Sequence, residues 1–275
     1  MLKLAVFGNP IKQSKSPIIH QQFAAQFELP VRYTAELSDE HSFKQDAQRF
    51  LAQPDAVGCN ITAPFKQQAF EIAALLSPAA ATARAVNTLQ VLEDGRLKGF
   101  NTDGGGLVND ILAVLDSISG SSVLLIGAGG AARGVLVDLL NQHIASLTIS
   151  NRTLENAQSL ADICNGLSSN CKVTACNFAD IPKAPFDLII NATSLSLHGD
   201  VPQIDPGLFA GSALAYDMVY GDKPTAFLTW AQQHGASQIR DGLGMLIGQA
   251  ALSFAIWTGK QPDVAPVMQL LREQD

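Results

Sequence analysis

Two charged side chains stand at positions where the sequence gives them no evident packing role. Lys66 ends the segment Gly58-Cys59-Asn60-Ile61-Thr62-Ala63-Pro64-Phe65-Lys66, which predicts a strand leading into a helix with Pro64 near its first residue. A lysine in a first helical turn opposes the helix dipole and gains nothing structurally, which favours a functional role. The alternative is an ordinary solvated lysine on the surface. Asp103 precedes another predicted helix, where it could also act as an N-cap. Such a pair suits proton transfer, because a carboxylate favours and orients a neighbouring ammonium group.

Hydroxyl and amide side chains occupy further element ends in the same third of the chain. In Ser14-Lys15-Ser16-Pro17 we expect Ser16 as an N-cap and Pro17 as the first helical residue. A helix N-terminus flanked by two hydroxyls also suits a carboxylate, and the two interpretations are compatible. Asn87, in Ala85-Val86-Asn87-Thr88, could be a simple turn residue. Taken together, these motifs predict a site for a small polyhydroxylated ligand.

A glycine-rich motif marks a second site. Ser122 to Ile126 reads as a buried strand and is followed directly by Gly127-Ala128-Gly129-Gly130-Ala131-Ala132 and an apolar-periodic helix. This is G-x-G-x-x-A in the strand–turn–helix setting of dinucleotide-binding folds, where the helix N-terminus receives a pyrophosphate. The alternative is a structural glycine turn. We favour dinucleotide binding because the context matches as well as the pattern.

The residues after the next predicted strand indicate which dinucleotide is bound. The predicted strand 146–150 is followed by Asn151-Arg152-Thr153. At this place an enzyme that uses NAD usually has an acidic residue, which binds the ribose 2′-hydroxyl. No acid is present here, and the planar guanidinium of Arg152 can pair with a 2′-phosphate. An arginine at a strand end is often only a solvated surface residue. The missing acid favours NADP as the cofactor.

Alternating strand-like and helix-like segments position these motifs and predict an α/β fold with parallel sheets and crossover helices. We expect two domains with a cleft between them: an N-terminal α/β substrate-binding and catalytic domain over residues 1–103, and a Rossmann-like, doubly wound nucleotide-binding domain over residues 104–242. An Asp94-Gly95 turn predicts a hairpin. The predicted strands are 3–7, 31–36, 56–61, 87–92, 96–100, 122–126 and 146–150, and the predicted helices are 17–27, 42–52, 64–75, 104–115, 130–142, 153–163, 243–257 and 263–273.

The composition excludes several classes of protein. The chain has 275 residues, of which 47% are hydrophobic and 16% charged, as expected for a folded protein of two domains. A net charge of −7 argues against a nucleic-acid partner. The longest uncharged stretch, 242–259, is too short to span a membrane comfortably, and no targeting segment is visible. The cysteines lack zinc-ligand spacing, so we expect reduced thiols, a cytoplasmic protein and no metal. They are Cys59, Cys164, Cys171 and Cys176.

A series of short motifs resembles the shikimate dehydrogenase family in both content and order. The motifs are SKSP, GCNITAPFK, AVNT, NTDG, GAGGAA, NRT, NATS, DMVY and DGLGMLIGQA. The resemblance covers nearly the whole chain and implies reduction of 3-dehydroshikimate to shikimate with NADPH, in the pathway to aromatic amino acids. It also implies that helices within residues 243–275 complete the first domain. We expect the protein to be a monomer or a homodimer.

The resemblance also assigns site residues. It implies Lys66 and Asp103 as the catalytic pair, which also contacts the substrate. The other substrate residues would be Ser14, Ser16, Asn60, Thr62, Asn87, Tyr220 and Gln249. The NADP residues would be Gly127, Ala128, Gly129, Gly130, Ala131, Asn151, Arg152, Thr153, Met218 and Gly242.

Two competing functions remain open at this point. The nearer one is a dehydrogenase of dual specificity for quinate and shikimate. The other is a non-catalytic dinucleotide-binding regulator, which the presence of both Lys66 and Asp103 disfavours.

Overall fold

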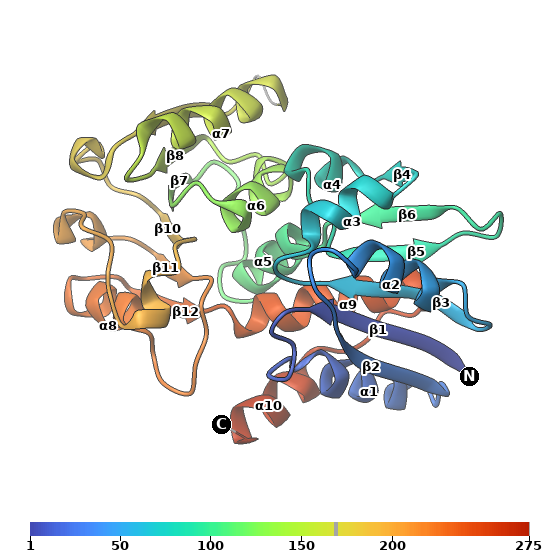
Figure 1. The fold of residues 1–275 in the computed structure, drawn as a ribbon. Helices are drawn as coiled ribbons and strands as arrows, with labels where there is room; N and C mark the ends of the chain where they lie inside the picture. The colour runs from blue at the N-terminus through green and yellow to red at the C-terminus, as the bar shows by residue number, and fades with distance from the viewer. Residues whose placement is uncertain (168–169, 275) are drawn as a thin grey trace. The chain divides into compact units, whose positions relative to one another are not determined.

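The computed structural model describes residues 1–167 and 170–274, which form two compact units (Figure 1). Unit 1 contains Met1–Gly106 and Leu246–Gln274, and unit 2 contains Leu107–Met245. The chain passes from one unit to the other within α5 (Asp103–Leu112) and again near the start of α9 (Leu243–Thr258). Within the described ranges, no helix is long and apolar enough to cross a membrane.

The sheet of unit 1 is mixed, whereas the sequence predicted parallel strands joined by crossovers. Its order is β2-β1-β3-β5-β6-β4; β1 is parallel to β2 and β3, but β5 is antiparallel to both β3 and β6. The predicted hairpin is confirmed as β5–β6, with Gly95 in its turn at φ +80°. The strands are β1 (Leu2–Gly8), β2 (Val31–Leu37), β3 (Ala56–Ile61), β4 (Leu75–Leu76), β5 (Thr88–Val91) and β6 (Leu97–Phe100).

Helices cover both faces of this sheet. Successive strand residues point to opposite faces, and apolar residues point to each of them. Phe7 of β1 packs in one cluster with Phe43 and Phe65, whose rings stack with centroids 4.6 Å apart. Leu4 and Val6, which point to the opposite face from Phe7, pack in another cluster with Trp257 of α9. The remaining helices of unit 1 are α1 (Ser16–Gln26), α2 (Phe43–Leu51), α3 (Lys66–Ile72), α4 (Pro78–Ala83) and α10 (Ala265–Gln274), the last of which contacts α1.

Two predicted helix starts are wrong. Ser16 is the first residue of α1 and not its N-cap. The backbone N–H of Ser16 donates a hydrogen bond to the Ser14 hydroxyl at 3.3 Å. Pro64 precedes α3, which begins only at Lys66 because residues 62–65 form a turn closed by a backbone hydrogen bond. The same helix was expected to reach residue 75 but ends at Ile72, since the chain then extends to pair as β4 with β6.

Unit 2 is a doubly wound sheet in which all strand pairs are parallel. The strand order β12-β11-β10-β7-β8-β9 reverses between β7 and β10, which is the place where open α/β sheets bind ligands. The strands are β7 (Ser122–Ile126), β8 (Ser146–Ser150), β9 (Lys172–Cys176), β10 (Leu188–Asn191), β11 (Leu214–Asp217) and β12 (Gln238–Asp241). The helices are α6 (Gly130–Leu140), α7 (Leu154–Leu167) and α8 (Ala226–Gln233), with short 3₁₀ helices η1 (Phe178–Asp180), η2 (Leu195–His198) and η3 (Pro206–Phe209).

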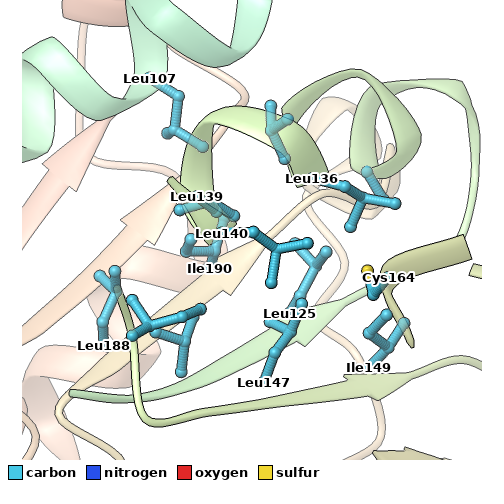
Figure 2. Packing of buried hydrophobic residues seen from close by; sticks show 14 of the residues in the cluster. Leu107, Leu125, Leu136, Leu139, Leu140, Leu147, Ile149, Cys164, Leu188 and Ile190 are labelled. Carbon is cyan, nitrogen blue, oxygen red and sulfur yellow. The ribbon is translucent and has the colours of Figure 1, made fainter. Parts of the chain in front are cut away.

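A continuous apolar core fixes α6 and α7 on the unit 2 sheet (Figure 2). Leu125 of β7 and Leu147 of β8 face Leu136 and Leu139 of α6, and all four side chains are fully buried. Leu107, from the part of α5 that belongs to unit 2, joins the same cluster. This packing holds the turn between β7 and α6, where the glycine motif lies, in a rigid frame.

Candidate active site and dinucleotide site

One edge of the unit 1 sheet collects most of the residues predicted to act on the substrate. Because β1 is parallel to β3, while β5 runs antiparallel to β3 and β6, the carboxyl ends of β1, β3 and β6 meet the amino end of β5. The segments that leave or enter the sheet at this edge carry Ser14, Ser16, Thr62, Lys66, Asn87 and Asp103.

Lys66 and Asp103 form a close ion pair at this edge. The Lys66 Nζ lies 2.6 Å from Asp103 Oδ2, and the two side chains are 33% and 16% exposed. Asp103 is the first residue of α5, and its other oxygen accepts a hydrogen bond from Asn87 at 2.8 Å. The carboxylate is therefore held by two donors, and its ammonium partner remains open to a ligand on its exposed side.

An amide and a hydroxyl extend this pair into a network. Asn87 Nδ2 donates to Thr102 Oγ1 at 2.9 Å and approaches Gln249 Oε1 at 3.3 Å. The backbone N–H of Thr102 donates back to Asn87 Oδ1 at 3.0 Å. Gln249 comes from the part of α9 that belongs to unit 1. The structure thus brings Lys66, Asp103, Asn87 and Gln249 together, although they are far apart in the sequence.

The other predicted substrate residues differ in their surroundings. Asn60 is only 5% exposed, and its amide is engaged with Tyr33 and Ser253 inside unit 1, so it supports the site from behind. Thr62 follows β3, and its methyl group packs close to Gly8 at the end of β1. Tyr220 belongs to unit 2, where it follows β11.

The carboxyl edge of the unit 2 sheet contains a cavity of about 800 Å³. It collects the glycine motif and the two residues that follow β8, as predicted for a dinucleotide. Sequence reasoning missed the rest of its lining, which follows β9 and β10. The cavity is lined by Gly127, Ala128, Gly129, Gly130, Ala131, Asn151, Arg152, Phe178, Ala192, Thr193, Ser194, Leu195, Asp200, Val201 and Gln203.

The geometry of the glycine motif fits the pyrophosphate of a dinucleotide. Gly127 turns the chain at φ +103°, a region that side chains disfavour. A Cβ atom on Gly129 or Gly130 would meet nothing within 4 Å, so the backbone there borders open space. α6 begins at Gly130 without a capping side chain, so its N–H groups and positive dipole end are available to an anion.

The residues after β8 supply the cationic part of this site. Arg152 is exposed and lines the cavity, and Asn151 braces the turn by donating to the backbone carbonyl of Thr153 at 2.9 Å. Thr153 itself is outside the cavity lining, as are Met218 and Gly242. Those last two residues lie together beyond β11 and β12, where a Cβ on Gly242 would strike the Met218 carbonyl oxygen.

A buried carboxylate organises the rim formed by residues 192–195. Asp217 Oδ2 accepts hydrogen bonds from Ser196 and Thr225, both at 2.6 Å, and Oδ1 accepts one from Asn191 at 3.1 Å. Burial raises the pKa of Asp217, and these donors oppose that rise. Asn191 in turn accepts from the hydroxyl of Thr193 at 2.7 Å. The polar run after the apolar strand β10 was the sequence signal that could have located this rim.

Gly127→Ala should destabilise the protein, because a side chain at φ +103° is strained and its Cβ would lie 3.1 Å from Thr193 and 3.3 Å from the Ala192 carbonyl. We expect a loss of about 1–3 kcal/mol in the free energy of unfolding, measured with urea. Gly129→Ala is the matched control, since its Cβ enters open space. It should leave unfolding unchanged and weaken dinucleotide binding; equal losses of stability in both variants would contradict the geometry.

Comparison with known proteins identifies the family that this chain resembles along most of its length. Family models match in three places: the shikimate dehydrogenase substrate binding domain at residues 6–89, shikimate / quinate 5-dehydrogenase at 110–198, and the shikimate 5′-dehydrogenase C-terminal domain at 242–272. A shikimate dehydrogenase (NADP(+)) of Vibrio cholerae is 48% identical over 269 residues, covering 98% of this chain and 95% of that protein.

Two solved structures share the whole fold. Shikimate 5-dehydrogenase from Thermus thermophilus, in complex with NADP(H) and shikimate, is 30% identical with a TM-score of 0.84 and covers 99% of each chain. Shikimate 5-dehydrogenase from Listeria monocytogenes, in complex with shikimate and NAD, is 28% identical with a TM-score of 0.90, covering 98% of this chain and 96% of that one.

Proposed function

The chain belongs to the shikimate dehydrogenase family, and we propose that Lys66 and Asp103 carry the proton transfer of its NADP-dependent oxidoreductase reaction, the interconversion of 3-dehydroshikimate and shikimate. The observation that supports this assignment best is the 2.6 Å ion pair at the polar edge of the unit 1 sheet. We place the reaction in the pathway to aromatic amino acids.

The residue types account for the chemistry. NADPH, when bound, supplies the hydride. As negative charge develops on the ketone oxygen, the Lys66 ammonium stabilises it and donates a proton to it. In the direction of shikimate oxidation, a neutral Lys66 accepts the proton of the reacting hydroxyl. Asp103 keeps the lysine oriented, and Asn87 in turn keeps the carboxylate oriented through its 2.8 Å hydrogen bond.

We propose that the other predicted substrate residues hold the substrate in place. Ser14 and Ser16, at the start of α1, would receive its carboxylate, because the first turn of a helix favours an anion. Thr62, Asn87 and Gln249 would contact its ring hydroxyls. Asn60 would act through the groups that it hydrogen-bonds, and the family resemblance adds Tyr220 from unit 2.

On the cofactor side, the cavity lining supports a role for the glycine motif in holding the pyrophosphate. Arg152 would pair with the 2′-phosphate and Asn151 would hold the turn. We retain Thr153, Met218 and Gly242 as cofactor residues on the family resemblance alone.

We further propose a cytoplasmic enzyme that acts on small molecules and not on nucleic acid. Its four cysteines are free thiols, which suits a reducing compartment. It would work as a monomer or a homodimer, and light scattering of the purified protein distinguishes these states.

The substrate preference gives a direct test. Quinate carries an extra hydroxyl on the carbon that bears the carboxylate, and this hydroxyl would face the helix N-terminus at Ser14 and Ser16. A pocket shaped for the flat, unsaturated ring of shikimate would have to expand or to desolvate this hydroxyl without pairing it, at a cost of about 1–3 kcal/mol, so kcat/KM should favour shikimate at least about tenfold. The measurement follows the absorbance of the reduced dinucleotide formed with each acid, which is NADPH when NADP is supplied and NADH when NAD is supplied.

In that comparison, similar kcat/KM values for the two acids would instead establish the dual-specificity enzyme. No turnover of either acid with either cofactor would contradict the assignment of the reaction.

A further inference from the structure

A line of buried polar side chains leads from the interior of unit 1 to the ion pair. The Tyr33 hydroxyl donates to Asn60 Oδ1 at 2.7 Å, and Asn60 Nδ2 donates to Thr88 Oγ1 at 3.1 Å. The Thr88 hydroxyl donates to Asn87 Oδ1 at 3.0 Å, and Asn87 Nδ2 donates to Asp103 Oδ1 at 2.8 Å. Tyr33, Asn60, Thr88 and Asn87 are all at most 5% exposed, so water cannot readily replace a missing partner.

The direction of donation along this line is determined at its inner end. Burial raises the pKa of Tyr33 well above its usual value, so its hydroxyl stays protonated and can donate to Asn60 Oδ1. Asn60 therefore presents its oxygen to Tyr33 and its NH₂ group to the other side. That NH₂ group also reaches the backbone carbonyl of Asn87 at 3.1 Å, an atom that can only accept. The orientation of the Asn60 amide is thus determined from both ends.

The hydroxyl of Thr88 transmits this orientation to Asn87. Since Thr88 Oγ1 accepts from Asn60, its proton is available to Asn87 Oδ1, which also accepts from the backbone N–H of Thr102 at 3.0 Å. A reversed Asn87 amide would place its oxygen against the Asp103 carboxylate and its NH₂ group against the Thr102 N–H. Both contacts would be repulsive.

Ser253 supports Thr88 from α9. Its Oγ lies 2.7 Å from Thr88 Oγ1, 3.1 Å from Asn60 Nδ2 and 2.9 Å from the Gln249 carbonyl oxygen. Because the Thr88 proton goes to Asn87 Oδ1, Ser253 is the donor in the 2.7 Å bond, and it shares its one proton between Thr88 and the Gln249 carbonyl. The side chain is fully buried. Ser253 therefore ties the strand that carries Thr88 to the helix that carries Gln249.

We propose that Thr88, supported by Ser253, is a positioning residue for the reaction: it holds the Asn87 amide so that Asn87 donates to Asp103 while Asp103 holds Lys66. Neither residue touches the ion pair directly. The inference rests on the proposed roles of Lys66 and Asp103.

Thr88→Val tests this role, because valine has nearly the shape of threonine but neither accepts from Asn60 nor donates to Asn87. We expect kcat with shikimate and NADP to fall about tenfold, the scale set by one unpaired buried polar group. The KM for NADP should change by less than about twofold, since the cofactor residues lie in unit 2. Thr88→Ser keeps the hydroxyl and should restore kcat to within about twofold of the wild type.

Thr148→Val is the matched control. Thr148 is another buried strand threonine, bonded to the hydroxyl of Thr174 at 3.2 Å, so its loss costs stability in unit 2 without disturbing the line to Asp103. Its kcat per folded molecule, with folding measured by thermal melting, should equal that of the wild type. Ser253→Ala is the second variant should Thr88→Val fail to fold, and a loss of about threefold in kcat is expected.

Three outcomes would overturn the inference while leaving the proposed function intact: wild-type kcat in folded Thr88→Val or Ser253→Ala, an equal loss of kcat in Thr88→Ser, or an equal loss in Thr148→Val. An inactive wild-type enzyme would overturn the proposed function and this inference together.

Discussion

Lys66→Met should lower turnover by roughly 10²–10⁴-fold, the usual contribution of a general acid–base group. Methionine preserves the length and bulk of the side chain, but it can neither donate a proton nor stabilise a developing alkoxide. The fold should persist, because Lys66 is at the start of a short helix and one-third exposed. Asp103 would still accept from Asn87, so its carboxylate would keep one partner. The check is steady-state kcat with saturating shikimate and NADP.

Lys44→Met is the matched control for this prediction. Lys44 belongs to the same unit and pairs with Glu71 at 2.6 Å, the same separation as in the Lys66–Asp103 pair, but both side chains of this second pair are about half exposed. Its removal should leave kcat unchanged. Near-wild-type turnover in folded Lys66→Met would remove the lysine from the mechanism.

Arg152→Ala should weaken the binding of NADP and leave that of NAD nearly unchanged. A charge-assisted contact to the 2′-phosphate is worth about 1.5–3 kcal/mol, which corresponds to roughly a 10- to 150-fold rise in Kd. Among the described residues that line the cavity, Arg152 is the basic one and Asp200 the acidic one, so no second lining cation can replace it. Fluorescence titration with each dinucleotide measures both constants.

Lys183→Ala controls for a general effect of charge in unit 2. Lys183 is 87% exposed and lies outside the cavity lining, so Kd for NADP should stay within about twofold of the wild-type value. If Arg152→Ala raised both dissociation constants equally, Arg152 would support the turn and would not read the phosphate. Titration with NAD as well as NADP is worthwhile because the similar shikimate 5-dehydrogenase from Listeria monocytogenes was solved with NAD bound.

Long buried strands ended by glycine or polar residues were predictable from the sequence. The bounds of β3, β7 and β8 agree with the predicted 56–61, 122–126 and 146–150, since each strand is followed directly by a polar residue or a glycine. The two-residue β4 was not predictable, because it exists only through its pairing with β6. Its absence from the prediction extended α3 by three residues.

The candidate site was predictable where a residue stands at the end of an element. Lys66, Asp103, Asn87 and Arg152 all do, so local patterns marked them as candidates, and the family resemblance then assigned roles to the first three. Thr88 and Ser253 support the ion pair through contacts that are 165 residues apart in the sequence, and no periodicity reports such a pairing. The visible signal was a serine and a glutamine within the otherwise apolar α9.

The central claim, that this chain reduces 3-dehydroshikimate with NADPH through Lys66, has one most direct test. Purified wild type and Lys66→Met are mixed with NADPH and 3-dehydroshikimate, and NADPH absorbance and shikimate are followed together. The wild type should form one shikimate for each NADPH consumed, and Lys66→Met should do so roughly 10²–10⁴-fold more slowly. NADPH consumption without shikimate, no consumption by the wild type, or equal rates in the two proteins would contradict the account.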